Sequence, residues 1–81
     1  MTDDTRALSF GEKAVGLTFN PSGDADADVQ VAKEAFAKAI DLCNHLRSRY
    51  GHCEKSRLLS VAITEAQGAA MWAVKGITWK E

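Results

Sequence analysis

Residues 56–79 read SRLLSVAITEAQGAAMWAVKGITW, and this stretch decides the fold of the 81-residue chain. It contains no proline, and its glycines are Gly68 and Gly76, the second of them near its end. The stretch predicts one helix, about 35 Å long at about 1.5 Å per residue. One face of this helix is apolar and is expected to pack on the rest of the chain. That face comprises Leu59, Ala62, Ile63, Ala66, Ala70, Ala73, Val74 and Ile77.

The opposite face of the same helix mixes polar and aromatic residues. Its polar stripe consists of Arg57, Ser60, Thr64, Gln67, Met71, Lys75 and Thr78. Beside the stripe lie Val61, Gly68 and Trp72, which a free surface would not favour. A helix with so little charged surface is usually covered on both sides. In a chain this short, we expect the second cover to be another copy of the same chain.

A second long helix is predicted at residues 24–50, beginning at a cap formed by Ser22 or Asp24 and ending at Gly51. Its apolar residues recur at helical spacing. They are Val29, Ala32, Phe36, Ala39, Ile40, Cys43, Leu46 and Tyr50. The connection at residues 52–55 is short, which favours antiparallel packing of the two long helices.

The N-terminal part of the chain predicts a shorter helix at residues 9–16. Ser9 and Glu12 have the spacing of a capping box, and Gly16 suits the left-handed residue after a helix end. Residues 1–8 are expected to form a loose arm, and residues 17–23 a turn around Pro21. The sequence therefore predicts one all-α domain at residues 1–81, a short helix followed by an antiparallel two-helix hairpin, assembling into a compact homo-oligomer.

Composition disfavours several classes of function. The formal net charge is −1, whereas proteins that bind duplex nucleic acid usually carry a basic face. We find no signal peptide and no apolar run of membrane length, so neither duplex nucleic acid nor a membrane is an expected partner. A cytoplasmic location with free thiols is the simplest interpretation. A metal site from Cys43, His45, His52 and Cys53 is conceivable, but their spacing fits no closed zinc pattern.

Catalytic motifs are missing from the sequence as well. There is no suggestive Ser–His–acid spacing, no Gly-rich phosphate loop and no H-E-x-x-H. We therefore expect no enzyme activity and no cofactor. The polar residues instead suit a compact anion, which needs a few cationic and hydroxyl donors for phosphate and flat surfaces for bases.

Candidate ligand-binding residues fall into two groups, each with a structural alternative. The long final helix offers phosphate donors at Arg57, Ser60, Thr64 and Lys75, which could instead form a subunit interface. The earlier group is Phe19, Asn20 and Lys33. Phe19 could stack on a base or fill the end of the core, and Asn20 could pair with a base edge or satisfy the turn. Lys33 could bind phosphate or face solvent.

The pattern S-R-x-x-S-x-A-x-T followed by A-x-M-W-A resembles the C-terminal helix of the phage anti-CBASS sponge proteins, which sequester cyclic nucleotide signals of bacterial antiviral defence. The matching residues are Ser56, Arg57, Ser60, Ala62, Thr64, Ala69, Met71, Trp72 and Ala73. The chain departs from the family pattern at Ala66 and Gln67, where a Leu-Glu pair is expected.

The resemblance implies a compact homohexamer that acts in the cytoplasm of the infected bacterium. It implies binding, without cleavage, of cyclic dinucleotides such as 3′,3′-cGAMP between protomers and of cyclic trinucleotides at a separate site. Some family members also take cyclic signals derived from NAD. By placement, Phe19, Asn20 and Lys33 are assigned to the dinucleotide pocket. The trinucleotide site, near a symmetry axis, is assigned Arg57, Ser60, Thr64 and Lys75.

Two other functions remain open from the sequence. The chain could be a structural or protein-binding helical hairpin, acting as an adaptor or as an inhibitor of a host protein. It could also be a small nucleic-acid-binding helical protein, which the near-neutral charge disfavours.

Overall fold

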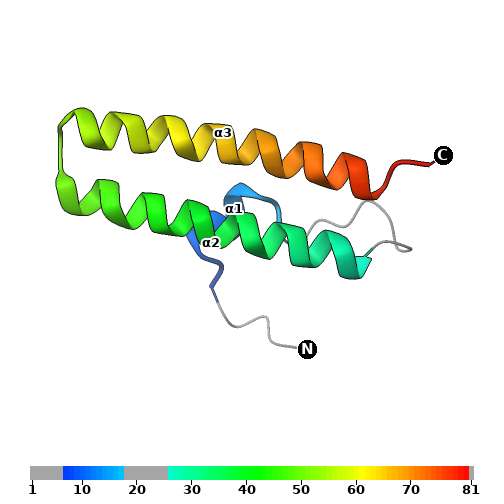
Figure 1. Ribbon diagram of the computed structural model, residues 1–81. Coiled ribbons are helices and arrows are strands. Elements are labelled where there is room, and N and C mark those ends of the chain that lie inside the picture. Colours follow the sequence, from blue (N-terminus) through cyan, green and yellow to red (C-terminus); the bar gives the residue numbers. More distant parts are fainter. Residues whose placement is uncertain (1–6, 18–25, 81) are drawn as a thin grey trace.

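The computed structural model describes residues 7–17 and 26–80, and within these ranges it contains three helices and no strand. They are α1 (Phe10–Ala14), α2 (Asp26–Tyr50) and α3 (Glu54–Ile77). Helices α2 and α3 lie side by side and antiparallel (Figure 1). The all-α hairpin predicted from the sequence is thereby confirmed for the single chain.

The ends of α3 differ from the prediction of 56–79. Cys53 has an extended backbone (φ −164°) and Glu54 begins the helix, where a carboxylate is stabilised by the positive end of the helix dipole. At the other end, Thr78 leaves the helix with ψ at 4°, and its N–H still donates to the carbonyl of Val74. Helix α3 therefore begins and ends two residues earlier than the predicted range of 56–79.

Helix α2 ends before Gly51, as predicted, and this glycine has a left-handed backbone. Gly51 has φ 77°, and its N–H donates to the carbonyl of Arg47 over 3.2 Å. The Ser56 hydroxyl lies 3.0 Å from the same carbonyl and also contacts that of Gly51. The Arg47 carbonyl in the last turn of α2 thus finds partners outside the helix, as the carbonyls of a helix end require.

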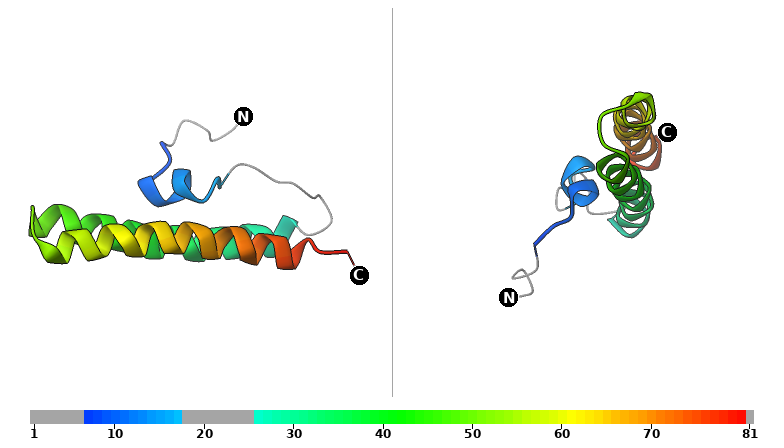
Figure 2. Two further views of the ribbon diagram at one scale, coloured as in Figure 1. Left: turned by 90° about the horizontal axis from the view of Figure 1, so that it is seen from above. Right: turned by 90° about the vertical axis from the view of Figure 1, so that its left-hand side faces the viewer.

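Helix α1 is shorter than the predicted 9–16, but its caps are those expected. The Ser9 hydroxyl accepts from the N–H of Glu12 (3.1 Å), and the Glu12 carboxylate accepts from the N–H of Ser9 (2.9 Å). Gly16 follows with φ 64°. Figure 2 shows α1 lying against one face of the layer that α2 and α3 form. Much of the predicted arm (1–8) and turn (17–23) lies outside the described residues.

The core is small and lies between the three helices. Its buried apolar residues are Leu17, Val29, Ala37, Ile40, Ile63 and Ala70. Ile63 and Ala70 belong to the predicted apolar face of α3, whereas Ala62 of that face is exposed. Phe10 of α1 is 44% exposed, and its ring lies beneath the guanidinium of Arg47.

Several large apolar side chains remain on the outside of α3. They are Leu58, Val61, Met71 and Trp72. Trp72 is 71% exposed, which is unusual for so large an apolar ring on a small protein. Within the described ranges, no helix combines the length and the apolar character needed to cross a membrane.

Candidate anion-binding sites

The first candidate site is a hollow of about 520 Å³ at the hairpin turn, here called the hairpin-tip hollow. It is lined by Arg47, Ser48, Gly51, His52, Cys53, Ser56, Arg57 and Ser60. Its residues come from the last turn of α2, the connection and the first two turns of α3. Because the two helices are antiparallel, cationic and hydroxyl side chains from both meet at this end.

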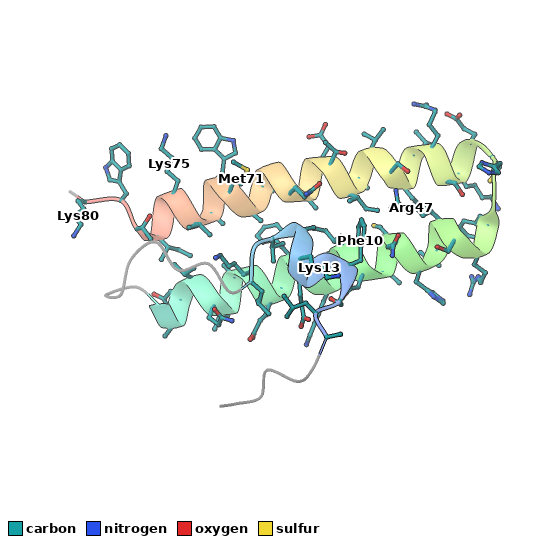
Figure 3. All side chains as sticks on the ribbon, turned by 180° about the vertical axis from the view of Figure 1, so that it is seen from behind. Phe10, Lys13, Arg47, Met71, Lys75 and Lys80 are labelled. Atoms are coloured by element: carbon teal, nitrogen blue, oxygen red, sulfur yellow. The ribbon has the colours of Figure 1, made fainter. Side chains whose placement is uncertain are left out.

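Arg47 is the residue that organises the hollow. Its Nη1 donates to the Ser60 hydroxyl over 2.9 Å, and its Nε donates to Asn44 over 3.1 Å. Its guanidinium lies 5.3 Å from the centre of the Phe10 ring, so α1 also contacts it. Figure 3 shows Arg47 near the hairpin turn, with Phe10 beside it. The guanidinium is therefore held in place by α1, α2 and α3 together.

Sequence analysis missed Arg47, because its helical position assigns it to the solvated face of α2. A signal was nevertheless present. In an antiparallel hairpin, residues at similar distances from the turn lie opposite each other. Arg47 precedes the turn by about as many residues as Ser56 follows it, which places it opposite the serines of α3.

Arg57 also lines this hollow, and it is paired within its own helix. Its Nε and Nη2 donate to the two carboxylate oxygens of Glu54, over 2.9 and 2.5 Å. The hydrogen bond from Arg57 holds the pKa of Glu54 below its usual value, and the Glu54 carboxylate raises the pKa of Arg57. Both side chains are well exposed, so solvent screens the pair and it contributes little stability.

The hydroxyls of α3 bond mainly to their own helix. Ser60 donates to the carbonyl of Ser56 (3.0 Å), and Thr64 donates to that of Ser60 (3.3 Å). Ser60 lines the hollow, whereas Thr64 is exposed one turn further along. The predicted group of Arg57, Ser60 and Thr64 therefore does lie along one stretch of α3.

Cys53 lies at the mouth of the hollow as the N-cap residue of α3. The backbone N–H of Ser56 lowers the pKa of its thiol. Its sulfur is 3.8 Å from the carbonyl of Tyr50. Among the residues that the structure describes, no three His, Cys, Asp or Glu side chains gather as they would to hold a metal ion.

The second candidate site is a cavity of about 350 Å³ between α1, α2 and α3, here called the α1 cavity. It is lined by Ala14, Val15, Lys33, Gln67, Ala70, Met71, Val74, Lys75 and Thr78. Most of these lining residues are apolar, and two of them are lysines. A cavity of this kind suits a ligand that combines a flat apolar part with an anionic group.

Lys33 is almost fully buried, at 3% exposure, and its Nζ donates to the carbonyl of Gly16 over 2.8 Å. Lys75 lies 5.1 Å from the centre of the Trp72 ring and 5.9 Å from that of Trp79. Gln67, at the position where the family pattern departs, reaches the carbonyl of Ala14 over 3.4 Å. It thus connects α3 to the end of α1.

The sequence grouped Lys75 with Arg57, whereas within one chain the structure places Lys75 in the same cavity as Lys33. The Arg57 and Lys75 positions are about 27 Å apart along α3, at about 1.5 Å per residue. Figure 3 shows Lys75 and Met71 near the C-terminal end of α3, far from Arg47. A trinucleotide site that includes both residues would need two copies of the chain, so that grouping stays a prediction. Phe19 and Asn20 lie outside the described residues.

Comparison with known families identifies the hairpin. Residues 12–78 match the model of a family described as "Acb2/Tad1, hairpin domain", and this range runs from α1 to the end of α3. Searches of curated proteins and of solved structures gave no match. The resemblance noted from the final helix is confirmed: the chain belongs to the Acb2/Tad1 hairpin family of anti-CBASS sponge proteins, which implies a role in binding cyclic nucleotides.

Proposed function

We propose that the protein binds and sequesters cyclic oligonucleotide second messengers without cleaving them, and so blocks CBASS signalling in the cytoplasm of an infected bacterium. The proposed ligands are cyclic dinucleotides such as 3′,3′-cGAMP and cyclic trinucleotides. The family match over residues 12–78 is the observation that carries this proposal.

The hairpin-tip hollow offers suitable donors for a cyclic trinucleotide. Each phosphodiester carries one negative charge, and a guanidinium binds such a group with two parallel hydrogen bonds. Arg47 is already oriented by Ser60. Arg57 is exposed and can exchange its bond to Glu54 for a phosphate at small cost, because an exposed pair contributes little.

The α1 cavity is the proposed position of a cyclic dinucleotide. Lys33 supplies a positive charge at this cavity, and Met71 and Val74 supply apolar surface against which a base can lie. Lys75 also lines the cavity, with its ammonium over the Trp72 ring. The predicted contributions of Phe19 and Asn20 would come from the segment that follows α1. We propose that these residues complete the pocket.

We further propose a homo-oligomer, a hexamer by analogy with the family. Support comes from the outer side of α3, where a hollow of about 420 Å³ is lined by Gly68, Met71, Trp72 and Lys75. A second copy of the chain would cover the exposed Trp72 ring there. A symmetric ligand suits a site where identical subunits meet, because each copy supplies the same groups.

We propose binding without cleavage because the groups assigned to the ligand are cations and hydroxyls. Guanidinium, ammonium and hydroxyl groups hold a phosphodiester, whereas hydrolysis requires a group that activates water by accepting its proton. Release of the ligand from denatured protein tests this part. We expect intact cyclic nucleotide by mass spectrometry, and a linear product would contradict the proposal.

Calorimetry with 3′,3′-cGAMP and with a cyclic trinucleotide tests binding directly. We expect heat at micromolar protein with at least one of them. Arg57→Ala should weaken trinucleotide binding about tenfold or more, the loss of one charge-assisted contact, while light scattering shows unchanged assembly. Lys38→Ala, which removes an exposed cation from the middle of α2, is the matched control.

The second candidate function is a protein-binding hairpin, favoured by the exposed apolar side chains of α3. It predicts no heat with either nucleotide. It also predicts that Arg57→Ala alters assembly or partner binding rather than nucleotide affinity.

A further inference from the structure

Helix α1 is fastened to α2 at one side chain, Asp41. The Ser9 hydroxyl donates to Asp41 Oδ2 over 2.7 Å, and the N–H of Gly11 donates to Oδ1 over 2.6 Å. Both bonds end on a carboxylate, and hydrogen bonds to a charged acceptor are about twice as strong as neutral ones. Asp41 therefore fixes where α1 begins.

Close packing at Gly11 makes this position specific. Gly11 is buried, and a Cβ built on it would overlap the carbonyl oxygen of Ala37 and come within 2.9 Å of Asp41 Oδ1. Only glycine permits such an approach of two backbones. Any larger residue at this position would lift α1 away from α2.

The other end of the same segment holds Lys33. Residues 9–17, here called the α1 segment, finish with the left-handed Gly16, whose carbonyl accepts from Lys33 Nζ over 2.8 Å, and with the buried Leu17. A buried ammonium is costly unless hydrogen bonds compensate it. The α1 segment supplies such a bond, and with Ala14 and Val15 it also forms one wall of the α1 cavity.

We propose that Asp41 is a positioning residue for ligand binding. It fixes the start of the α1 segment, the segment places the Gly16 carbonyl, and this carbonyl helps to hold the Lys33 ammonium at the α1 cavity, where a phosphodiester would bind. The identity of the ligand rests on the proposed function. Asp41 itself contacts no ligand and acts through Lys33.

The variant that tests the placement of the α1 segment is Gly11→Ala, with Gly76→Ala as the matched control. Both are Gly→Ala changes in helices, but a Cβ on Gly76 meets no atom within 4 Å. Asp41→Asn is the second variant, since an amide keeps the shape but weakens both bonds. Circular dichroism and light scattering establish that helicity and assembly are kept, and Asp41→Asn carries the test if Gly11→Ala changes either.

The first readout needs no ligand. Acetic anhydride labels accessible lysines, and mass spectrometry compares Lys33 with the exposed Lys38 in the same molecule. We expect Lys33 to react at least about tenfold more slowly than Lys38 in the wild type, because only 3% of Lys33 is exposed and its Nζ donates to the Gly16 carbonyl. Gly11→Ala and Asp41→Asn should largely abolish this difference and Gly76→Ala should keep it. Unchanged protection in both test variants would overturn the proposal.

The second readout is affinity for 3′,3′-cGAMP. We expect a loss of about tenfold in Gly11→Ala, Asp41→Asn and Lys33→Met, as for one charge-assisted contact. If the α1 segment acts through Lys33, adding Gly11→Ala to Lys33→Met should lower the affinity by less than about twofold, since the effects of coupled residues are not additive. Fully additive losses would overturn the proposal. A wild type that binds no cyclic nucleotide would refute the proposed function, a result distinct from unchanged labelling.

Discussion

Replacing Arg47 by methionine should destabilise the hairpin measurably, although the residue lies near the surface. Methionine keeps most of the apolar stem and removes the guanidinium. The change deletes a hydrogen bond to Ser60, another to Asn44, and the contact with the Phe10 ring. None of these partners is fully buried, so water partly replaces what is lost.

The magnitude follows from these three contacts. Each half-buried hydrogen bond contributes about 0.5–1 kcal/mol at such a site, and an exposed cation–π contact about 0.5 kcal/mol. The expected loss in free energy of unfolding is therefore about 1.5–2.5 kcal/mol. Urea unfolding followed by circular dichroism should show a midpoint lowered by about 1 M or more at an unchanged slope.

Arg49→Met is the control for this experiment. Arg49 is exposed, and its guanidinium lies 5.6 Å from the centre of the Tyr50 ring, so its loss should cost less than about 0.5 kcal/mol. Both variants and the wild type are compared at one protein concentration, because assembly stabilises the folded state by mass action. Equal midpoints for Arg47→Met and the wild type would refute the reasoning that Arg47 joins the three helices.

Three further predictions concern α3 and its start. The Glu54 pKa is lowered by Arg57, so the pair stabilises the fold above the unfolded-state pKa of Glu54 and stops doing so as the pH falls through the folded-state pKa. The free energy of unfolding of the wild type and of Arg57→Ala should therefore depend differently on pH in that acidic window. Identical pH profiles would contradict the pairing. The thiol pKa of Cys53 is lowered by the N–H of Ser56, so iodoacetamide should modify the exposed Cys53 faster than the half-buried Cys43, as peptide mapping can establish. Trp72→Ala should reduce the assembled mass in light scattering at micromolar protein, since a buried indole at an interface commonly contributes about 2 kcal/mol or more; an unchanged mass would place the interface elsewhere.

Much of the fold follows from the sequence, because helical periodicity and caps are local properties. A few neighbouring residues are enough to predict a helix cap or a helix end. The capping box of Ser9 and Glu12 forms, and Gly16 and Gly51 follow the ends of their helices with positive φ. Ile63 and Ala70 are buried as their spacing predicts. Helix α3 begins at Glu54 rather than at the predicted Ser56, whose hydroxyl donates to a carbonyl of the last turn of α2.

The candidate sites were harder to predict, because they depend on which residues of different helices face each other. Periodicity gives the faces of each helix but not the register between helices. Arg47 meets Ser60 and Lys33 meets Gly16 only once the hairpin and α1 are in place. Asp41 illustrates the limit most clearly: in the sequence it is one acid on a solvated face, and in the structure it receives both Ser9 and Gly11.

Because α1 lies on one side of the two-helix layer, the two broad sides of the molecule differ (Figure 2). A bare pair of amphipathic helices has two comparable broad sides, and such a plate can stack on copies of itself without limit. With one side occupied by its own chain, each copy has a single broad side left to offer. Copies that met through this side alone would close as pairs, so a larger assembly such as the proposed hexamer would need a further contact surface.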